Sequence, residues 1–384
     1  MKLPIYLDNA ASTPLDPKVA EKMLPYLVDS DYCGNAASGH IYGWRAEQAI
    51  AAARVQVAEL IQAKEREIIW TSGATEAINL ALKGVAAFYP QKKHIITVNT
   101  EHKSVLATCE YLAGQGYEVT YLQPKPDGLL DIEDLLAALR SDTLLVSIMH
   151  VNNEIGVIQD IVNIGAIVRK NGSLFHVDAV QSAGKLSIDV EAMSIDLLSL
   201  SAHKMHGPKG VGALYVRRKP RVRLVPIIHG SGHEEGLRSG TLPTHQIVGF
   251  GEACAIAHER LNAHRAHLQV LRDRLWQGLG DLPNIVRNGN KTHTAPHILN
   301  VSFKGVDGET LLMALQDIAV SSGAACNTIS VSPSHVLKAI GLRDEQARAT
   351  IRFSIGRFNT QDEIDFAISH IKMQIAHLHG EGPA

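Results

Sequence analysis

The sequence has no long hydrophobic run and no strong excess of charge of either sign. No apolar stretch in the 384 residues comes near the roughly 18 residues that a membrane-spanning helix needs, so no membrane span is expected. Residues 1–8 lack the apolar segment of a secretion signal, and we therefore expect a cytoplasmic protein. The formal net charge of −2 provides no global field that would attract nucleic acid or an anionic membrane.

Cysteine is also scarce, and its spacing excludes several kinds of site. None of the four cysteines lies in a C-x-x-C pair, which argues against a zinc ribbon or a dithiol redox motif. Cys109 and Cys254 fall in helical patterns and are interpreted as buried packing residues. Cys326 stands apart, because the small residues around it at 321–328 offer little to pack against. The two histidines of the glycine-rich segment 229–233 have no third ligand nearby, so no metal site is predicted.

The chain does contain a regular alternation of strand and helix patterns. With 45% hydrophobic and 20% charged residues, it has the composition of a globular protein. Short apolar segments alternate with amphipathic ones, which is typical of βαβ units in a mostly parallel sheet. We predict helices over 47–63, 74–87, from 104 onward and over 131–140, and strands over 67–70, 94–98, 117–122, 143–149, 173–178 and 195–201.

A long helical pattern over 246–279 is expected to carry the chain into a second domain. The segments after it are predicted as strands over 298–303, 318–321 and 349–354, and as helices over 308–317 and 334–340. This is the pattern of a small α+β domain. We therefore expect a large domain over 15–255 and a small domain formed by 1–14 and 256–384, with a frayed end at 380–384.

Two polar side chains follow apolar strands that are neighbours along the chain. Lys204 follows the strand at 195–201, and Asp178 ends the strand at 173–178. In open α/β folds such strand ends lie at the rim where ligands bind. A lysine there can act as a nucleophilic amine and a carboxylate can keep a pyridinium nitrogen protonated, as a pyridoxal phosphate enzyme requires. The alternative is a structural ion pair between Asp178 and Lys204 at the sheet edge.

Other polar residues also follow the ends of predicted strands. Residues 71–76 join a strand to a helix, and we interpret them as a phosphate cradle, with an ordinary helix N-cap as the alternative. Ser201, His203 and Thr241 are candidates for further phosphate donors. His102 follows another strand end, where an imidazole can stack on a flat ring and move protons; a surface helix cap is the alternative.

Taken in order, these segments resemble the motifs of the IscS/NifS-type cysteine desulfurases, and the resemblance covers essentially the whole chain. The matching segments are 6–14, 71–76, 100–102, 150–156, 176–178, 201–204, 238–241 and 321–326. The resemblance implies an α/β pyridoxal phosphate-dependent transferase of fold type I, with a mostly parallel seven-stranded sheet, a small α+β domain and a homodimer. It also implies pyridoxal 5′-phosphate as cofactor, and conversion of L-cysteine and an enzyme thiol into L-alanine and an enzyme persulfide.

The same resemblance implies roles for individual residues. Lys204 is similar to the Schiff-base lysine, Asp178 to the pyridinium partner and His102 to the ring-stacking acid–base group. Cys326 resembles the sulfur acceptor. Further cofactor contacts are implied for Ala74, Thr75, Asn153, Gln181, Ser201, His203 and, from the other subunit, Thr241, and substrate contacts for Asn35, Asn153 and Arg352.

Some features depart from the family pattern. The loop 34–40 lacks the usual proline, Glu235 stands where a basic residue is common, and His206 stands where tyrosine is usual. The chain is expected to end before the C-terminal tail with which family members hold an iron–sulfur scaffold. The sulfur acceptor is accordingly left open between an iron–sulfur scaffold, a tRNA-thiolation relay and a DNA phosphorothioation system.

Two other functions are weighed against desulfuration. One is another pyridoxal phosphate enzyme of the same fold, such as a selenocysteine lyase or an aminotransferase. The other is a non-catalytic sulfur relay. Cys326 distinguishes a desulfurase from an aminotransferase of the same fold, because an aminotransferase does not need this thiol. The run 217–223, with five cations in seven residues, is either a solvated strand and turn or a docking patch for an acidic protein or an RNA.

Overall fold

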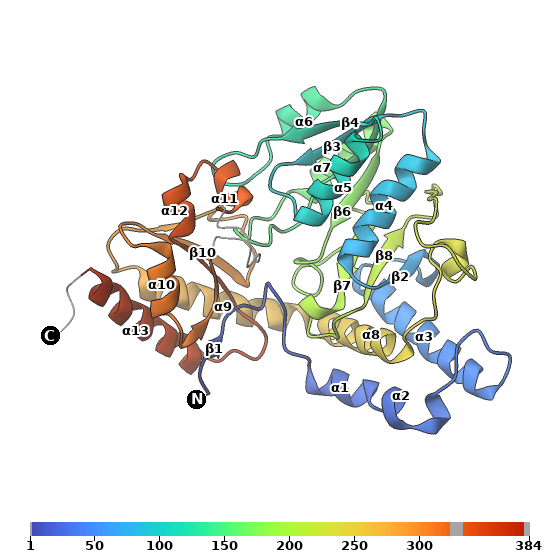
Figure 1. Cartoon of the computed structure of the whole chain (residues 1–384), viewed down its shortest axis with the longest axis horizontal. Coiled ribbons are helices and arrows are strands. Elements are labelled where there is room, and N and C mark those ends of the chain that lie inside the picture. The colour runs from blue at the N-terminus through green and yellow to red at the C-terminus, as the bar shows by residue number, and fades with distance from the viewer. Residues whose placement is uncertain (1, 323–332, 380–384) are drawn as a thin grey trace.

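The computed structural model describes residues 2–322 and 333–379, and its larger part is built on a seven-stranded sheet (Figure 1). The strands across the sheet are β2 (Ile68–Thr71), β8 (Gly212–Val216), β7 (Leu197–Ser201), β6 (Leu174–Asp178), β5 (Thr143–Ser147), β3 (His94–Val98) and β4 (Glu118–Leu122). All neighbouring pairs are parallel except the two that β8 makes with β7 and β2. The predicted α/β fold with a mostly parallel seven-stranded sheet is confirmed.

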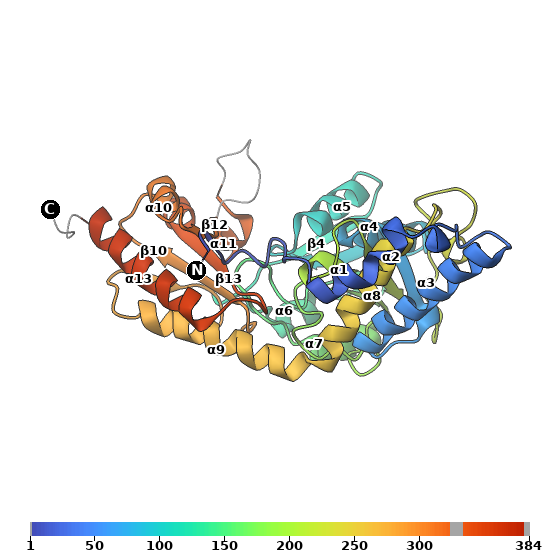
Figure 2. The ribbon, with the colours of Figure 1, turned by 90° about the horizontal axis from the view of Figure 1, so that it is seen from below.

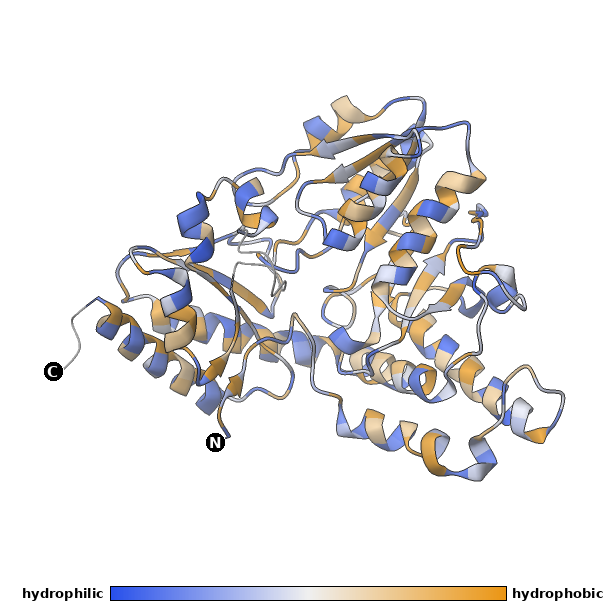
Figure 3. Cartoon of the chain, in the orientation of Figure 1, coloured by the Kyte–Doolittle hydropathy of each residue, from blue (hydrophilic) through white to orange (hydrophobic). Residues whose placement is uncertain are grey.

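Helices cover both faces of this sheet, because its strands are apolar on both sides. The helices of this part are α1 (Pro17–Met23), α2 (Pro25–Val28), α3 (Ile41–Leu60), α4 (Ala74–Phe88), α5 (Lys103–Ala113), α6 (Ile132–Ala138), α7 (Ile161–Asn171) and α8 (Thr244–Glu259), with short 3₁₀ turns η1 (Ser30–Tyr32), η2 (Glu65–Glu67), η3 (Ala202–Lys204) and η4 (Glu234–Gly236). Helices α3, α7 and α8 share one apolar core with the sheet, and α4 and α5 share another. Figure 3 shows that the strands of the large sheet are largely hydrophobic, as strands buried on both faces must be.

The second part carries its own sheets and helices. Its elements are β1 (Ile5–Tyr6), α9 (Leu261–Leu279), β9 (Ile285–Arg287), β10 (Ile298–Phe303), α10 (Gly308–Ala314), β11 (Ile318–Ala319), β12 (Ser321–Ser322), α11 (His335–Ala339), α12 (Asp344–Arg348), β13 (Thr350–Ser354) and α13 (Gln361–Leu378). Strands β12, β13, β10 and β9 form an antiparallel sheet, and β1 pairs with β11 in parallel. Helix α9 runs from α8 into this part (Figure 2). We propose that residues 15–255 form one domain and residues 1–14 and 256–384 the other; a separate apolar core around β10, β13, α9 and α13 supports this division.

One expected helix is two helices in the structure. The pattern over 246–279 was expected to form a single stretch, but α8 ends and α9 begins on either side of Arg260, whose φ is −108° and ψ 14°. The apolar side of α8 packs on the large sheet, whereas that of α9 packs on α13 and β10. The break lets the two apolar sides face different cores. Of the helices in residues 2–322 and 333–379, none has the length and apolarity needed to cross a bilayer.

Candidate active site

The ends of the central strands surround a cavity of about 640 Å³. The turns after β6 and β7, the start of α4 and the start of α5 line it, together with residues 10–12 and Arg352 from the second part of the fold. Its volume lies within the roughly 300–1,000 Å³ that is usual for ligand sites. This is the rim at which doubly wound sheets bind their ligands.

Lys204 reaches this cavity from η3, the short turn directly after β7. Its Nζ donates hydrogen bonds to the main-chain oxygens of Ala10 and Ala11, each at 2.7 Å. Asp178 accepts a hydrogen bond from the main-chain N–H of Val180 at 3.0 Å. The Lys204 amine therefore bonds to two carbonyl groups, and its charge also acts on Asp178.

The carboxyl group of Asp178 is buried at the end of β6. Burial raises its pKa, while the N–H of Val180 and the positive charges of His102 and Lys204 act in the opposite direction. A cation placed opposite this group inside the cavity would therefore stabilise the ionised carboxylate. The position suits a carboxylate that must face a pyridinium nitrogen.

His102 caps α5 and also lines the cavity. Its Nδ1 lies 2.7 Å from Ser104 Oγ and accepts from the Ser104 N–H at 3.2 Å, so the ring orientation is fixed. Burial lowers the pKa of His102, and the charge of Lys204 acts in the same direction against the opposing effect of Asp178. The helix-cap interpretation is correct, and the same ring also lines the cavity.

The predicted phosphate cradle lies at the N-terminus of α4, where Ala74 and Thr75 line the cavity together with Ser201 and His203. An N-terminal helix turn offers main-chain N–H groups and a favourable dipole to an anion. His203 Nδ1 lies 3.2 Å from Ser12 Oγ. Burial and the neighbouring Lys204 lower the pKa of His203 to about 4, so its ring is an uncharged hydrogen-bonding group.

Three further predicted residues, Gln181, Asn153 and Arg352, line the cavity. Gln181 donates to the Ala10 oxygen at 2.8 Å. Asn153 Oδ1 and Arg352 Nε are buried and have no hydrogen-bond partner. The rest of the Arg352 guanidinium donates to the Asn153 oxygen at 2.9 Å and pairs with Asp8 at 2.7 Å. Buried polar atoms without partners are costly unless a ligand satisfies them.

Two predicted residues do not reach this cavity. Asn35 lies in the loop before α3, where its Oδ1 accepts from the Ala37 N–H at 3.0 Å. Thr241 is exposed in the segment before α8. Neither residue lines the cavity of its own chain. Cys326 lies outside the described residues.

Two buried residues at the site were missed by the sequence reasoning. Lys185 donates from Nζ to the main-chain oxygen of Lys204 at 2.8 Å. Glu101 accepts from the Met149 N–H at 2.7 Å, its other oxygen has no partner, and burial raises its pKa well above the ordinary range. The sequence points to these two residues only through their positions: Glu101 precedes His102, and Lys185 follows Gln181 by four residues.

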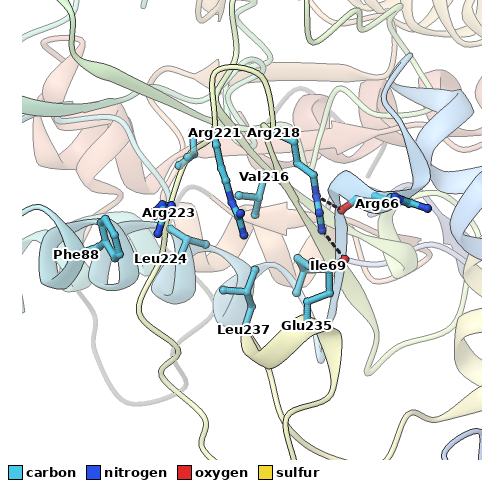
Figure 4. Close-up of a pocket in the computed structure, with 11 residues that line it drawn as sticks. Arg66, Ile69, Phe88, Val216, Arg218, Arg221, Arg223, Leu224, Glu235 and Leu237 are labelled. Carbon is cyan, nitrogen blue, oxygen red and sulfur yellow. Dashed lines mark hydrogen bonds and ion pairs between the residues drawn. The ribbon is translucent and has the colours of Figure 1, made fainter.

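The basic run divides into a buried and an exposed part. Arg217 is buried and binds Asp196, Glu191 and two main-chain carbonyl groups, so including it in a docking patch was wrong. Arg218 pairs with Glu235 and donates to the Arg66 oxygen (Figure 4). Arg221 and Arg223 are exposed and, with Arg218, help to line a pocket of about 160 Å³ whose walls combine apolar and charged side chains.

A single cavity is lined by a strand-end carboxylate, by a lysine in the turn after the next strand and by a helix start that can accept an anion. These residues fit pyridoxal phosphate, and the unpartnered Asn153 Oδ1 is a polar atom that such a ligand can satisfy. Across residues 2–322 and 333–379, no group of three or more histidine, cysteine or acidic side chains is placed to hold a metal ion. Fold and site thus define the class of pyridoxal phosphate-dependent transferases.

Comparison with known proteins narrows this class. The model of the Aminotransferase class-V family matches residues 5–366. The chain is 58% identical over 385 residues to the cysteine desulfurase IscS of Pectobacterium carotovorum subsp. carotovorum (strain PC1), covering 100% of this chain and 95% of that protein. It is 59% identical to IscS of Proteus mirabilis (strain HI4320), with the same coverage. A solved structure of a NifS-like protein matches with a TM-score of 0.91 and 38% identity, covering 98% of this chain and 100% of the other.

The chain belongs to the class-V aminotransferase family, whose members depend on pyridoxal phosphate, and within it to the cysteine desulfurases. The predicted resemblance to the IscS/NifS-type enzymes is confirmed.

Proposed function

We propose that this cysteine desulfurase binds pyridoxal 5′-phosphate in the cavity at the ends of β6 and β7, and transfers the sulfur of L-cysteine to Cys326. The observation that carries the proposal is the convergence of Lys204 and Asp178 on one cavity from neighbouring strands. Bound there, the cofactor would withdraw electrons from the α-carbon of an attached amino acid. We expect the enzyme to work in the cytoplasm.

The polar groups of the cavity would hold the cofactor in one orientation. The start of α4, with Ala74 and Thr75, would bind the phosphate, assisted by the Ser201 hydroxyl and the His203 ring. Asp178 would face the ring nitrogen, and Gln181 would bond the phenolate oxygen. His102 would stack on the ring face. Lys204 would carry the cofactor between turnovers.

The substrate would be oriented by its carboxylate. Arg352 is buried beside the cavity, with a guanidinium that can donate to a carboxylate while Asp8 and the Asn153 oxygen keep its plane fixed. Asn153 also lines the cavity, and its buried Oδ1 has no hydrogen-bond partner. The freed Lys204 amine would then take the α-proton, and a proton would be returned to the β-carbon to complete L-alanine.

The sulfur step balances without an external oxidant. The Cys326 thiolate attacks the substrate sulfur, the bond from that sulfur to the β-carbon breaks, and a sulfur–sulfur bond forms on Cys326. L-cysteine and the enzyme thiol thereby become L-alanine and the enzyme persulfide. A thiolate suits this attack because it is a soft nucleophile, whereas a hydroxyl group is not.

Asn35 and Thr241 are proposed to act from the partner subunit of a homodimer. Each lies away from the cavity of its own chain. A second copy that covers this surface would bring Thr241 to the phosphate and Asn35 to the substrate entrance. The expected Thr241→Ala phenotype is weaker retention of the cofactor without loss of the dimer, measured by dialysis and by sedimentation.

The persulfide is proposed to pass to an acidic sulfur-acceptor protein that docks beside the pocket in Figure 4. Four arginines, Arg66, Arg218, Arg221 and Arg223, line this pocket, and among them Arg221 has the side chain least engaged by neighbouring groups. Charge reversal by Arg221→Glu is expected to slow sulfur transfer to an iron–sulfur scaffold protein and to leave alanine production unchanged. Equal transfer rates at low ionic strength would contradict this docking site.

The central test uses two variants and labelled cysteine. Cys326→Ala is expected to keep the visible absorbance of the bound cofactor but to form no labelled persulfide on the protein, as read by mass analysis. Sulfide production at the wild-type rate in this variant would exclude Cys326 as the acceptor and favour a lyase that needs no thiol. Lys204→Ala is expected to bind the cofactor without any covalent bond that borohydride can trap, and a trapped adduct at wild-type yield would exclude Lys204.

A further inference from the structure

A second lysine, Lys185, contacts the main chain of Lys204, the proposed catalytic residue. Lys185 follows β6 in the turn that begins at Asp178, and its side chain is buried. Its Nζ donates to the main-chain oxygen of Lys204 at 2.8 Å. The proposed mechanism assigns no role to this group.

The surroundings of Lys185 make its burial costly. The charges of Lys204 and Arg357 act on it, and Arg357 is itself paired with Asp16 at 2.8 Å. Among the described residues no carboxylate pairs with Lys185. Burial, followed by the charges of Lys204 and Arg357, lowers the pKa of Lys185 to about 7. A buried lysine without an anionic partner destabilises a fold, so its presence needs another explanation.

The short turn that carries Lys204 offers an explanation for the buried Lys185. The main-chain oxygen of Ala202 accepts hydrogen bonds from the N–H groups of Met205 and Gly207, and that of His203 accepts from the N–H of Thr13. The oxygen of Lys204 accepts from the Lys185 side chain instead. A three-residue turn has no helical ladder to hold its last residue, and the Lys185 side chain supplies a hydrogen bond at that residue.

We propose that Lys185 is a positioning residue, whose amine fixes the carbonyl group of Lys204 and thereby aims the Lys204 side chain into the cavity. This inference rests on the proposed role of Lys204. Lys185 itself does not line the main cavity; it lines a small separate pocket on the other side of the Lys204 backbone. It acts on the reaction through Lys204 and not through the substrate.

The test compares Lys185→Met, Lys185→Gln and the wild-type holoenzyme. Methionine keeps most of the length and removes the donor, whereas glutamine keeps an N–H donor on a slightly shorter side chain. Misplacement of a catalytic group by about 1 Å can cost about 100-fold in rate, so we expect kcat of Lys185→Met to fall by about that factor. The KM for cysteine should stay within about twofold, because Arg352 and not Lys185 holds the substrate carboxylate.

A readout separate from turnover follows the cofactor on Lys204. After pyridoxal phosphate is added to each variant, borohydride trapping with mass analysis of the Lys204 peptide gives the rate of covalent attachment. We expect attachment about tenfold slower in Lys185→Met and an intermediate rate in Lys185→Gln. Lys92→Met is the matched control, since Lys92 Nζ also donates to main-chain oxygens, those of Thr143 at 3.1 Å and Gly172 at 3.2 Å, far from the cavity. This control should leave both readouts unchanged.

The outcomes separate this inference from the proposed function. A wild-type enzyme that forms no trapped adduct would overturn the role of Lys204 itself. A wild-type adduct together with unchanged kcat and attachment rate in Lys185→Met would overturn the role of Lys185 alone. Equal losses in Lys185→Met and Lys185→Gln would also overturn it, because they would assign the effect to packing and not to the hydrogen bond.

Discussion

Replacing Arg217 with methionine should lower the free energy of unfolding by about 3–5 kcal/mol, the usual cost of breaking a buried ion pair on one side. Arg217 is 1% exposed in its side chain, and its Nε lies 3.2 Å from the Asp196 carboxylate, which is 10% exposed. The guanidinium also donates to the oxygens of Ile195 at 2.9 Å and Val190 at 3.0 Å. Methionine fills much of the same space but removes the guanidinium donor from this carboxylate and from these carbonyl groups.

Most of this cost should come from Asp196 and not from Glu191. The Glu191 side chain is 70% exposed, so water replaces its contact with Arg217 at little cost. Asp196 keeps one hydrogen bond, from the Phe175 N–H at 2.9 Å. Burial already raises its pKa against the opposing effects of Phe175 and Arg217, and removal of Arg217 raises it further. The folded variant therefore holds a proton on Asp196 that the unfolded chain has released above about pH 4.

The stability deficit of Arg217→Met should accordingly grow as pH rises from the raised pKa of Asp196 in the wild type toward the still higher pKa of Asp196 in the variant. Urea unfolding of the holoenzyme at a series of pH values measures this deficit. Adding Asp196→Asn should recover part of it, because the amide removes the unpaired charge and can still accept from Phe175. Arg221→Met is the matched control: Arg221 is exposed, and we expect a change below about 0.5 kcal/mol. The reasoning would be refuted if the urea midpoint of Arg217→Met equalled that of the wild type at every pH.

Three further predictions test the site. Asp178→Asn should lower kcat by about 100-fold or more, since an amide cannot balance a protonated ring, and should shift the visible absorption band of the cofactor; an unchanged band would contradict the assigned contact. Arg352→Lys should raise the KM for cysteine about 10- to 100-fold by removing the bidentate donor, which initial rates would measure. Glu101→Gln should unfold within about 1 kcal/mol of wild type near pH 5 and gain stability relative to it as pH rises, because Glu101 holds a proton only when folded; a constant difference across pH would exclude a protonated Glu101.

The sequence by itself determined the fold class and most of the site. Alternating apolar and amphipathic segments predict six of the seven strands of the large sheet to within a few residues, because hydrophobic periodicity is a local property of the chain; β8 was not predicted. The strand ends place Asp178 and Lys204 together, since parallel strands present their carboxyl ends at one edge. Helix α13 was not predicted, although its capping box of Thr360 and Glu363 is a readable signal.

Only the tertiary structure decided what each polar side chain contacts. The run at 217–223 reads as uniformly basic, yet Arg217 is buried on Asp196 while Arg221 is exposed, because burial depends on where the strand lies in the sheet. The contact of Lys185 with the Lys204 oxygen joins two turns that follow neighbouring strands. No local pattern encodes such a contact, since the distance between two side chains is fixed by packing and not by their spacing along the chain.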